Sequence, residues 1–239
     1  MAQEIWIGIA ASDEGAQGWR FSGAKALATA KGRSVQEITA QLGDGPALVV
    51  AEGQARQPAP AAVLSDTLPL ADLTQDKPRG LLCAVARLRI LGVLSQRPNW
   101  DGVICLPMAG VTHWCQISAN EIVSFQSALT LQLAQSLKAS DAADPEAVAD
   151  TMSRPERLAL HLRSATLSGS GEAAAGHLLG AELAAMRPYW LGQQVISVTH
   201  NSLYSGTLSL QGVPVETVDP QDASRLGLVA LYEAHHPRQ

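Results

Sequence analysis

Few residues in this chain have the type and spacing that chemistry requires. Glu182 is a carboxylate inside an apolar helical segment, where a charge is costly unless paired, so it either faces a cleft or pairs structurally, for example with Arg187. His113 lies in a Thr-His-Trp turn and can contact an anion when protonated, which its ordinary pKa near 6.5 makes dependent on pH. An ordinary turn histidine is the alternative. Ser168-Gly169-Ser170-Gly171 is similar to a phosphate loop, but no strand precedes it and no lysine follows, which favours a linker between helices.

The cysteines and histidines do not indicate a metal site. Cys83, Cys105 and Cys115 form an odd set without metal-type spacing, and His235-His236 has no partner at ligand spacing. We therefore expect no metal ligands, and we expect the cysteines to be reduced. No local arrangement predicts a nucleophile with its base, so the catalytic residues stay unknown.

Composition sets the class of protein. The chain has 239 residues, a formal net charge of -5 and a sequence pI near 5.6. Its 17 lysines and arginines are scattered, so we expect binding neither to nucleic acid nor to a membrane surface. Residues 1–6 lack the basic and apolar regions of a signal peptide, and no apolar run reaches about 18 residues. These features favour the cytoplasm.

The first half of the chain predicts a meander of strands followed by a helix and another strand. Residues 4–10 and 17–21 form a predicted hairpin, and a third strand follows near 26–30. Ser34 and Glu37 have the spacing of a capping box, which starts a helix that should end near Gly43. The remaining predicted elements are a short buried strand at 47–51, parallel to the first, a strand and helix within 80–94, and a linker at 95–99.

The second half repeats this order. Predicted strands at 101–107, 112–118 and 121–127 precede a helix at about 128–138. Asp144-Pro145 and a capping box at 153–156 predict two further helix starts. The other expected elements are a long buried helix at 172–191 with small residues at Gly176, Gly180 and Ala184, a strand at 194–198, and a final helix at 223–234 with Leu226, Val229 and Ala230 inward.

Two segments carry a family resemblance. Leu178-Leu179-Gly180-Ala181-Glu182-Leu183-Ala184-Ala185-Met186-Arg187 and the stretch from Asp101 to Leu137 resemble the 2-dehydro-3-deoxygalactonokinase family of the actin/hexokinase superfamily. The resemblance implies an α/β, two-lobed, actin/hexokinase-like (ribonuclease H-like) fold, each lobe a mixed sheet with flanking helices. The expected lobes are residues 1–97 and 98–239. It also implies an ATP-dependent carbohydrate kinase that uses magnesium, phosphorylates the terminal hydroxyl of a keto-deoxy sugar acid and serves galactonate catabolism.

The phosphate-binding hairpin departs from this family's pattern. The family turn is Asp-Trp-Gly-Ser-Thr-Asn with a nearby arginine, and this chain has Ala10 at the aspartate and Gln17 at the arginine. Asp13 and Glu14 then lie at the tip, where they would repel phosphates. Using Asp13-Glu14-Gly15 as a displaced Asp-x-Gly motif would shift the hairpin by three residues and turn alternate side chains to the wrong face. An ordinary solvated turn is favoured.

Other family motifs survive in part. In the family's Thr-His-x-Lys-Trp turn, this chain has His113 at the position of the lysine. The family's Thr-Gly-Glu motif corresponds to Thr130-Leu131-Gln132 here, and its Arg-Gly-Glu-Glu motif corresponds to Ala84-Val85-Ala86-Arg87. The family's Gly-Thr-Ser-Leu motif corresponds to His200-Asn201-Ser202-Leu203. The resemblance implies substrate or cleft candidates at Thr112, His113, Trp114, Thr130 and Glu182, and nucleotide-side candidates at Ser12 and Ser202.

Two hypotheses follow for the function. The chain is either a working kinase with ATP and magnesium as cofactors, or a pseudoenzyme that needs neither and binds a sugar acid or a protein partner. Losing one preorganised electrostatic contact costs roughly 10²–10³ in rate, which favours the second for activity. A small-molecule sugar acid is the expected ligand, and a homo-oligomer is left open.

Overall fold

The structure is a computed structural model that describes residues 4–236, so the first three residues of the segment expected not to be a signal peptide lie outside it. The described residues fold as two compact units. Unit 1 comprises residues 4–101, 117–124 and 218–236, and unit 2 comprises residues 102–116 and 125–217. The predicted lobe boundary between residues 97 and 98 stays a prediction.

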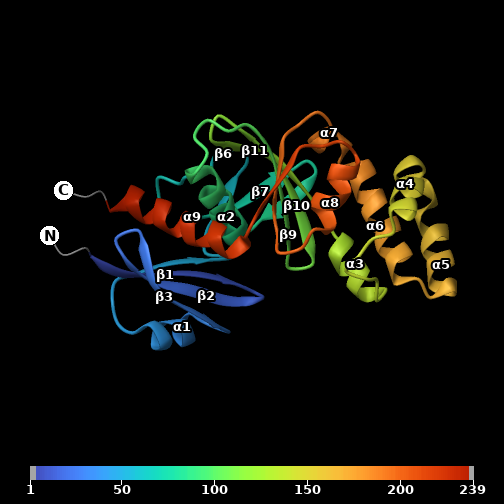
Figure 1. The fold of residues 1–239 in the computed structure, drawn as a ribbon. Coiled ribbons are helices and arrows are strands. Elements are labelled where there is room, and N and C mark those ends of the chain that lie inside the picture. The colour runs from blue at the N-terminus through green and yellow to red at the C-terminus, as the bar shows by residue number, and fades with distance from the viewer. Residues whose placement is uncertain (1–3, 237–239) are drawn as a thin grey trace. The chain divides into compact units, whose positions relative to one another are not determined.

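Unit 1 contains a four-stranded sheet that confirms the predicted meander (Figure 1). Its strands are β1 (Ile5–Ser12), β2 (Gly15–Ser22), β3 (Lys25–Gly32) and β4 (Ala47–Ala51), in the order β3-β2-β1-β4. β1 and β2 pair antiparallel, and β4 pairs parallel to β1, as expected. The turn between β1 and β2 is shorter than expected, because pairing continues to Ser12 and Gly15.

Helix α1 (Val35–Leu42) covers one face of this sheet (Figure 1). The Ser34 hydroxyl accepts a hydrogen bond from the Glu37 backbone N–H at 3.2 Å, and the helix ends at Gly43, whose φ of 80° suits glycine. The predicted cap is confirmed, although the Glu37 carboxylate accepts from the Arg33 N–H and not from that of Ser34. Ile38 packs in the buried cluster below β1.

Helix α9 (Pro220–His235) covers the opposite face (Figure 1). The Trp6 ring stacks between Phe21 and Tyr232, with ring centroids 4.2 and 3.9 Å away. The predicted inward face of this helix was wrong. Leu226, Val229 and Ala230 are only half-buried, whereas Ala223, Ser224, Gly227, Leu228, Leu231 and Tyr232 are buried.

The inward face of α9 is set by its contact with helix α2 (Ala84–Ser95). A Cβ atom at Gly92 would clash with the backbone carbonyl of Ala223, and one at Gly227 would clash with that of Leu88. The two backbones therefore approach closely only because both positions are glycine. The strand that precedes α2, β8 (Arg79–Leu82), pairs with β7 (Asp72–Asp76), which in turn pairs with β5 (Arg56–Pro58).

A six-stranded sheet has the order β13-β12-β9-β10-β11-β6. Its strands are β6 (Ala61–Ala62), β9 (Gly102–Met108), β10 (Val111–Ser118), β11 (Glu121–Ala128), β12 (Val195–Val198) and β13 (Val215–Val218). The strands predicted in the second half are thereby confirmed. β12 lies parallel to β9. Cys105 and Cys115 are buried in β9 and β10, Cys83 is half-buried, and all three are free thiols.

The helices of unit 2 follow these strands (Figure 1). They are α3 (Thr130–Ser136), α4 (Pro145–Ser153), a 3-10 turn (Pro155–Arg157), α5 (Leu158–Ser168), α6 (Gly171–Ala185), α7 (Arg187–Trp190) and α8 (Leu203–Leu210). Gly169 and Ser170 end α5 and cap α6, which confirms the expected linker. A Cβ atom at Gly176 would lie 2.6 Å from the Asp144 carbonyl of the α4 cap, which confirms the expected close approach.

Two predicted helical features were wrong. The long helix expected at 172–191 ends at Ala185, and α7 then begins with Pro188 in its first turn, since proline cannot continue the preceding helix. The capping box expected at 153–156 does not form, because the Ser153 hydroxyl donates to the Asp150 carbonyl within α4. The helix expected at about 128–138 is confirmed as α3, two residues shorter at each end. Within the described residues, the helices are too short or too polar to cross a membrane.

We predict that Gly92→Ala lowers the free energy of unfolding by about 1–3 kcal/mol, because α2 and α9 must separate to admit the methyl group. Gly206→Ala is the matched control, since its added Cβ meets no atom within 4 Å and alanine favours a helix by up to about 1 kcal/mol over glycine. Denaturant midpoints measure both. Equal midpoints for Gly92→Ala and the wild type would contradict the close contact.

Candidate functional site

Glu182 is buried in unit 2 and receives hydrogen bonds from three side chains. The Trp114 indole N–H donates to its Oε1 at 2.7 Å, and the Tyr204 hydroxyl donates to its Oε2 at 2.9 Å. Thr130 supplies a third hydrogen bond. Glu182 is 4% exposed, and Trp114 and Tyr204 are fully buried. A carboxylate with three donors meets the requirement that a buried charge be hydrogen-bonded.

Thr112 extends this network. Its hydroxyl lies 2.6 Å from the Tyr204 hydroxyl. Since tyrosine has one hydroxyl proton and gives it to Glu182, Thr112 donates to the tyrosine oxygen. Four of the five predicted cleft candidates, together with Tyr204, are therefore joined in one cluster. We call it the Glu182 network, and its members are Thr112, Trp114, Thr130, Glu182 and Tyr204.

The Glu182 network holds elements of unit 2 together. Burial raises the pKa of Glu182, and the hydrogen bonds from Thr130, Trp114 and Tyr204 oppose that rise. The structural alternative foreseen for Glu182 is thus present, but its partners are these three donors and not Arg187. A role of the network in contacting a substrate stays a prediction.

His113 is a buried neutral histidine. It is 7% exposed, its Nδ1 lies 2.8 Å from the Ser127 hydroxyl, and burial lowers its pKa to about 4. A neutral imidazole supplies no positive charge at pH 7. The structure therefore favours an ordinary structural histidine at this position over a cationic anion ligand.

The register of the β1–β2 hairpin in unit 1 places Ala10 directly opposite Gln17. Successive side chains of a strand alternate between faces, so Ala10 lies on the face of Trp6 and Gly8, toward α9. The Gln17 side chain lies on the same face, where its Nε2 donates to the Gln221 Oε1 at 3.0 Å. The two positions at which the resembled family has an aspartate and an arginine therefore hold the methyl group of Ala10 and the neutral amide of Gln17.

A hollow of about 220 Å³ lies beside this hairpin, within unit 1. Ser12, a predicted nucleotide-side residue, lines it, and its hydroxyl accepts from the Glu14 N–H at 3.3 Å. Lys31 and Arg89 also line it, and neither was foreseen from the sequence. They come from β3 and α2, and no local spacing links them to the hairpin. Asp13 is exposed and does not line the hollow.

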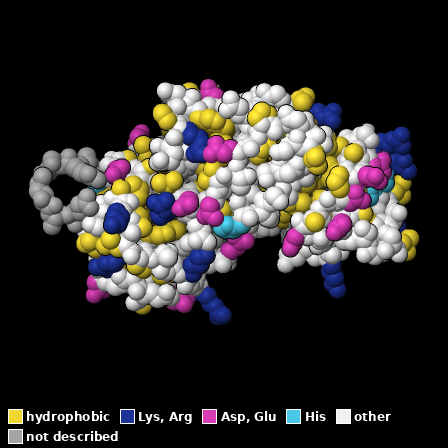
Figure 2. All heavy atoms as spheres, in the orientation of Figure 1, with side chains coloured by type: hydrophobic (Ala, Val, Ile, Leu, Met, Phe, Trp, Pro, Cys, Tyr) yellow, Lys and Arg dark blue, Asp and Glu magenta, His cyan; other side chains and the backbone are white. Residues whose placement is uncertain are grey.

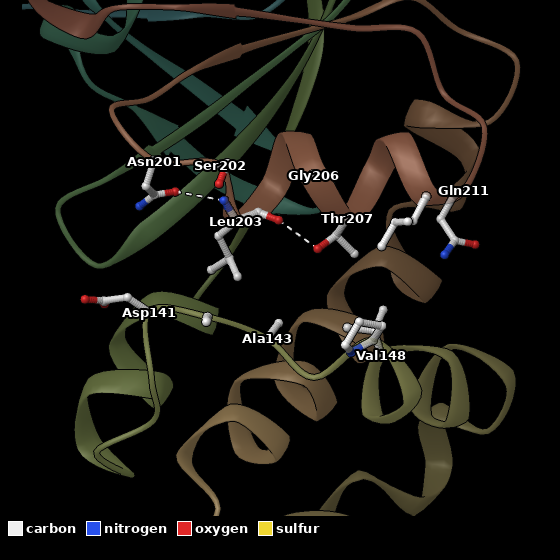
Figure 3. A pocket seen from close by; sticks show the side chains of 12 residues that line it. Asp141, Ala143, Val148, Asn201, Ser202, Leu203, Gly206, Thr207 and Gln211 are labelled. Carbon is white, nitrogen blue, oxygen red and sulfur yellow. Dashed lines mark hydrogen bonds between the residues drawn. The ribbon is translucent and has the colours of Figure 1, made fainter.

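A larger pocket of about 630 Å³ lies within unit 2 (Figure 3). α8 and the segment before it form one wall, and the segment leading into α4 forms the other. Ser202, the second predicted nucleotide-side residue, lines the pocket. Its lining is mainly apolar with a few polar groups: Asp141, Ala142, Ala143, Pro145, Val148, Asn201, Ser202, Leu203, Gly206, Thr207, Leu210 and Gln211. Such a volume and lining suit a small organic ligand.

Local hydrogen bonds order the start of α8 (Figure 3). The Asn201 Oδ1 accepts from the Leu203 N–H at 3.2 Å, and the Thr207 hydroxyl donates to the Leu203 carbonyl at 2.7 Å. The side-chain oxygen of Asn201 therefore accepts from one of the backbone N–H groups at the start of α8, which is then not available to an anion.

The described residues contain no group of three or more His, Cys, Asp or Glu side chains that could hold a metal ion. In the hollow of unit 1 Glu14 is the carboxylate present, beside Lys31 and Arg89. On the face that Figure 2 shows, acidic and basic side chains are interspersed, in line with their scattered positions in the sequence.

Known proteins share this fold. The sequence profile of the 2-keto-3-deoxy-galactonokinase family matches residues 87–231, and no curated protein is matched. A Sinorhizobium meliloti protein proposed to be a 2-dehydro-3-deoxygalactonokinase superposes with a TM-score of 0.82 and 17% identity, over 98% of this chain and 100% of that chain.

Two more distant structures agree. The activator of 2-hydroxyisocaproyl-CoA dehydratase from Clostridium difficile, with bound ADPNP, gives a TM-score of 0.52 at 12% identity, covering 97% of this chain and 96% of that chain. Component A of the (R)-2-hydroxyglutaryl-CoA dehydratase from Acidaminococcus fermentans gives 0.53 at 12%, covering 97% and 98%. The predicted α/β actin/hexokinase-like fold is confirmed.

We predict that Glu182→Gln lowers the free energy of unfolding by about 1–3 kcal/mol, since the glutamine N–H₂ group must then face one of the N–H or O–H donors. Glu172→Gln, at an exposed position of the same helix, should change it by about 0.5 kcal/mol or less. Chemical denaturation compares the two variants, and equal effects would show that the Glu182 network adds no stability.

We predict that the His113 ring titrates near pH 4, because burial lowers its pKa in the folded state. The unfolded chain then binds the proton more tightly, so this group lowers stability as pH falls from about 6.5 toward 4. NMR of the imidazole carbons measures the titration. The stability lost between pH 7 and pH 5 should be smaller in His113→Gln than in the wild type, and a ring midpoint near 6.5 would refute the prediction.

Proposed function

Because this chain belongs to the 2-keto-3-deoxy-galactonokinase family, we propose that it is a kinase-like protein that binds an adenine nucleotide but transfers no phosphoryl group. The observation that carries this proposal is the hairpin register, which sets Ala10 opposite Gln17 on the face of the hollow. These are the positions at which the resemblance requires a carboxylate for the metal and a cation for the phosphates.

The residues beside the hollow do not fit magnesium. Mg²⁺ takes oxygen ligands, usually one or two carboxylates together with water and substrate phosphates. The methyl group of Ala10 offers no ligand, and Glu14, the carboxylate at the hollow, has the cations Lys31 and Arg89 beside it. Losing one electrostatic contact with the transition state already lowers the reaction rate by roughly 10²–10³. Because residues that act as a unit have non-additive effects, each further missing group need not lower the rate by the same factor again.

The pocket of unit 2 supports the binding half of the proposal. Its volume of about 630 Å³ falls within the usual range for small-molecule sites, and its apolar walls suit a base while Asn201, Ser202 and Gln211 offer polar partners. The resemblance assigns Ser202 to the nucleotide side, and one structure of similar fold carries ADPNP. An adenine nucleotide is the ligand we expect.

A working kinase is the second candidate. It would phosphorylate a keto-deoxy sugar acid with ATP and magnesium in galactonate catabolism. The observation in its favour is the positive charge of Lys31 and Arg89 at the hollow, which could replace the missing hairpin arginine in neutralising a phosphate.

Calorimetry with ATP tests the proposal. We expect an affinity that is the same with Mg²⁺ and with EDTA, because no metal-holding carboxylate is present at Ala10. We expect no ADP release above background when keto-deoxy sugar acids are added.

Two variants of α8 locate the nucleotide. Gly206→Leu adds a side chain where a Cβ atom meets nothing within 4 Å, so it should fill the pocket and abolish binding while the protein stays folded. Ser209→Leu adds the same side chain at an exposed position of the same helix outside the pocket lining and should bind normally. Turnover by the unmodified chain would establish the second candidate in place of the first.

A further inference from the structure

Three helices of unit 2 meet at one side-chain oxygen. The Thr151 hydroxyl of α4 lies 2.8 Å from the His161 Nδ1 of α5 and 2.9 Å from the His177 Nδ1 of α6. The two imidazole rings lie beside each other, with their centroids 4.7 Å apart. Thr151 is fully buried, His161 is 9% exposed and His177 is half-buried. We call these three residues the histidine clasp.

The histidine clasp has one hydroxyl proton for two ring nitrogens. Because a hydroxyl donates one hydrogen bond, Thr151 donates to one Nδ1, and the other Nδ1 must carry a proton and donate to Thr151. The Asp150 Oδ2 lies 3.4 Å from the His161 Nε2, where a carboxylate favours a proton on the ring. His161 therefore accepts from Thr151 at Nδ1, and His177 donates to it. The two neutral rings have opposite tautomers.

Helix α5 depends on the histidine clasp for much of its attachment. The buried residues of α5 are His161 and Ala165. Helix α4, in contrast, is held on α6 by close backbone contacts, since a Cβ atom at Gly180 would lie 2.5 Å from the Val148 carbonyl. A change in the clasp should therefore affect the packing of α5 before that of α4.

Protonation removes what holds the histidine clasp together. A proton on the His161 Nδ1 occupies the position that accepts from Thr151, so the hydroxyl loses its acceptor. A charged His161 can still pair with Asp150, but a charge on His177 would then lie beside it. Like charges at this distance repel each other. The first proton is therefore partly compensated, and the second is not.

The surroundings of His177 oppose its charge. Burial lowers the pKa of His177, and the neighbouring His161 lowers it further. A hydrogen bond to the Ala147 backbone and the charges of Asp150 and Asp144 raise it in part. The ring released from the docked helices therefore binds a proton more tightly than the docked ring, so docking weakens as the pH falls below about 6.5.

The other charged side chains on or beside these elements do not change this balance. On α4, the 3-10 turn, α5 and α6 they are Glu146, Arg154, Glu156, Arg157, Arg163, Glu172 and Glu182. All are exposed except Glu182, whose carboxylate is bound in the Glu182 network. Exposed charges are screened by solvent and salt. The acids that act on the clasp are therefore Asp150 and Asp144.

We propose that the histidine clasp is a pH-sensitive switch, in which α5 is docked on α4 and α6 while both rings are neutral and undocks when both are protonated. Because two protons are needed, the response to pH is steeper than that of a single histidine. The switch needs no ligand, so it does not depend on the nucleotide proposal.

Hydrogen exchange of the full chain at pH 7.5 and pH 5.0 tests this inference, with each rate divided by the intrinsic rate at that pH. The protection of the α5 amides should fall about fourfold or more at pH 5.0, because two unit charges 4.7 Å apart repel each other even at the dielectric constant of water. The amides of β9 are the reference, since His113 lowers the stability of the whole unit over the same pH range. The loss in α5 should exceed the loss in β9.

Three variants separate the switch from other effects of pH. His177→Gln removes the second charge while its amide can still donate to Thr151, so the protection of α5 should change less with pH than in the wild type. His200→Gln is the matched control, because His200 is an exposed histidine of unit 2 outside the clasp, and it should keep the wild-type response. Thr151→Val keeps the shape of the side chain but removes the hydroxyl, so α5 should lose protection already at pH 7.5.

Nitrogen NMR of the rings gives a readout that a merely structural role would not move. At pH 8 His161 should carry its proton on Nε2 and His177 on Nδ1, and both rings should be doubly protonated where α5 loses protection. Equal tautomers at pH 8, a loss in α5 no larger than that in β9, or equal responses of His177→Gln and the wild type would overturn the inference. Should His177→Gln undock α5 at both pH values, the agreement between ring titration and α5 exchange in the wild type decides the question.

Discussion

The pairing register of the β1–β2 hairpin determines which of its side chains line the hollow of unit 1. Ser12 pairs with Gly15 and Ala10 with Gln17, so a turn of two residues closes the ladder. Gly15 makes this turn possible, because its φ is 128° and a Cβ atom there would lie 2.9 Å from the Gly32 carbonyl. Since a slip of one residue would reverse every side chain, Ala10 and Gln17 are fixed at the hollow, and Asp13 is excluded from it.

The Glu182 network gives a physical reason why family residues are retained in unit 2 while the hairpin residues of unit 1 differ from the family pattern. Thr112, Trp114, Thr130 and Glu182 satisfy one another in the core, so replacing any of them leaves a buried polar group without its partner. The altered hairpin positions carry no such penalty. Ala10 is a buried methyl group, and the Gln17 amide pairs with Gln221. The stability of the fold is therefore a sufficient reason for the Glu182 network to be retained, and it places no such constraint on positions 10 and 17.

Sequence patterns predicted those helices and strands that are determined by residues close together in the chain. Apolar runs and turn chemistry predicted β1 to β4 and β9 to β11, and side-chain caps predicted the starts of α1 and α4. Patterns failed where a distant contact decides. The capping box at 153–156 gave way to the Ser153–Asp150 hydrogen bond, and the inward face of α9 moved because α2 comes close enough to require Gly227. α8 and β13 are short and lacked a periodic signal.

The site residues that the sequence missed are joined only by long-range contacts. Tyr204 lies 22 residues from Glu182 and 92 from Thr112, and Arg89 lies 135 residues from Ser224. No spacing rule spans such separations, so these partners emerge only when the chain is folded. The sequence could show which family groups had been lost, but not which cations had come close to the same hairpin.

The positive charge of Arg89 is compensated within unit 1, because nearby Glu14, Glu52 and Asp219 raise its pKa against the effect of burial. Placing a guanidinium in a largely buried position costs free energy, and replacing a buried charged group by apolar residues of similar volume is often neutral or stabilising. Arg89 could be replaced by a leucine or methionine against Val85 if packing of α2 on the sheet were all that the position served. Arg89 instead donates from its Nε to the Ser224 hydroxyl, and this hydrogen bond together with the nearby acids lowers the cost of its partial burial. The hairpin hollow therefore keeps charged side chains whose cost is offset within unit 1, although Ala10 and Gln17 supply neither a carboxylate nor a cation.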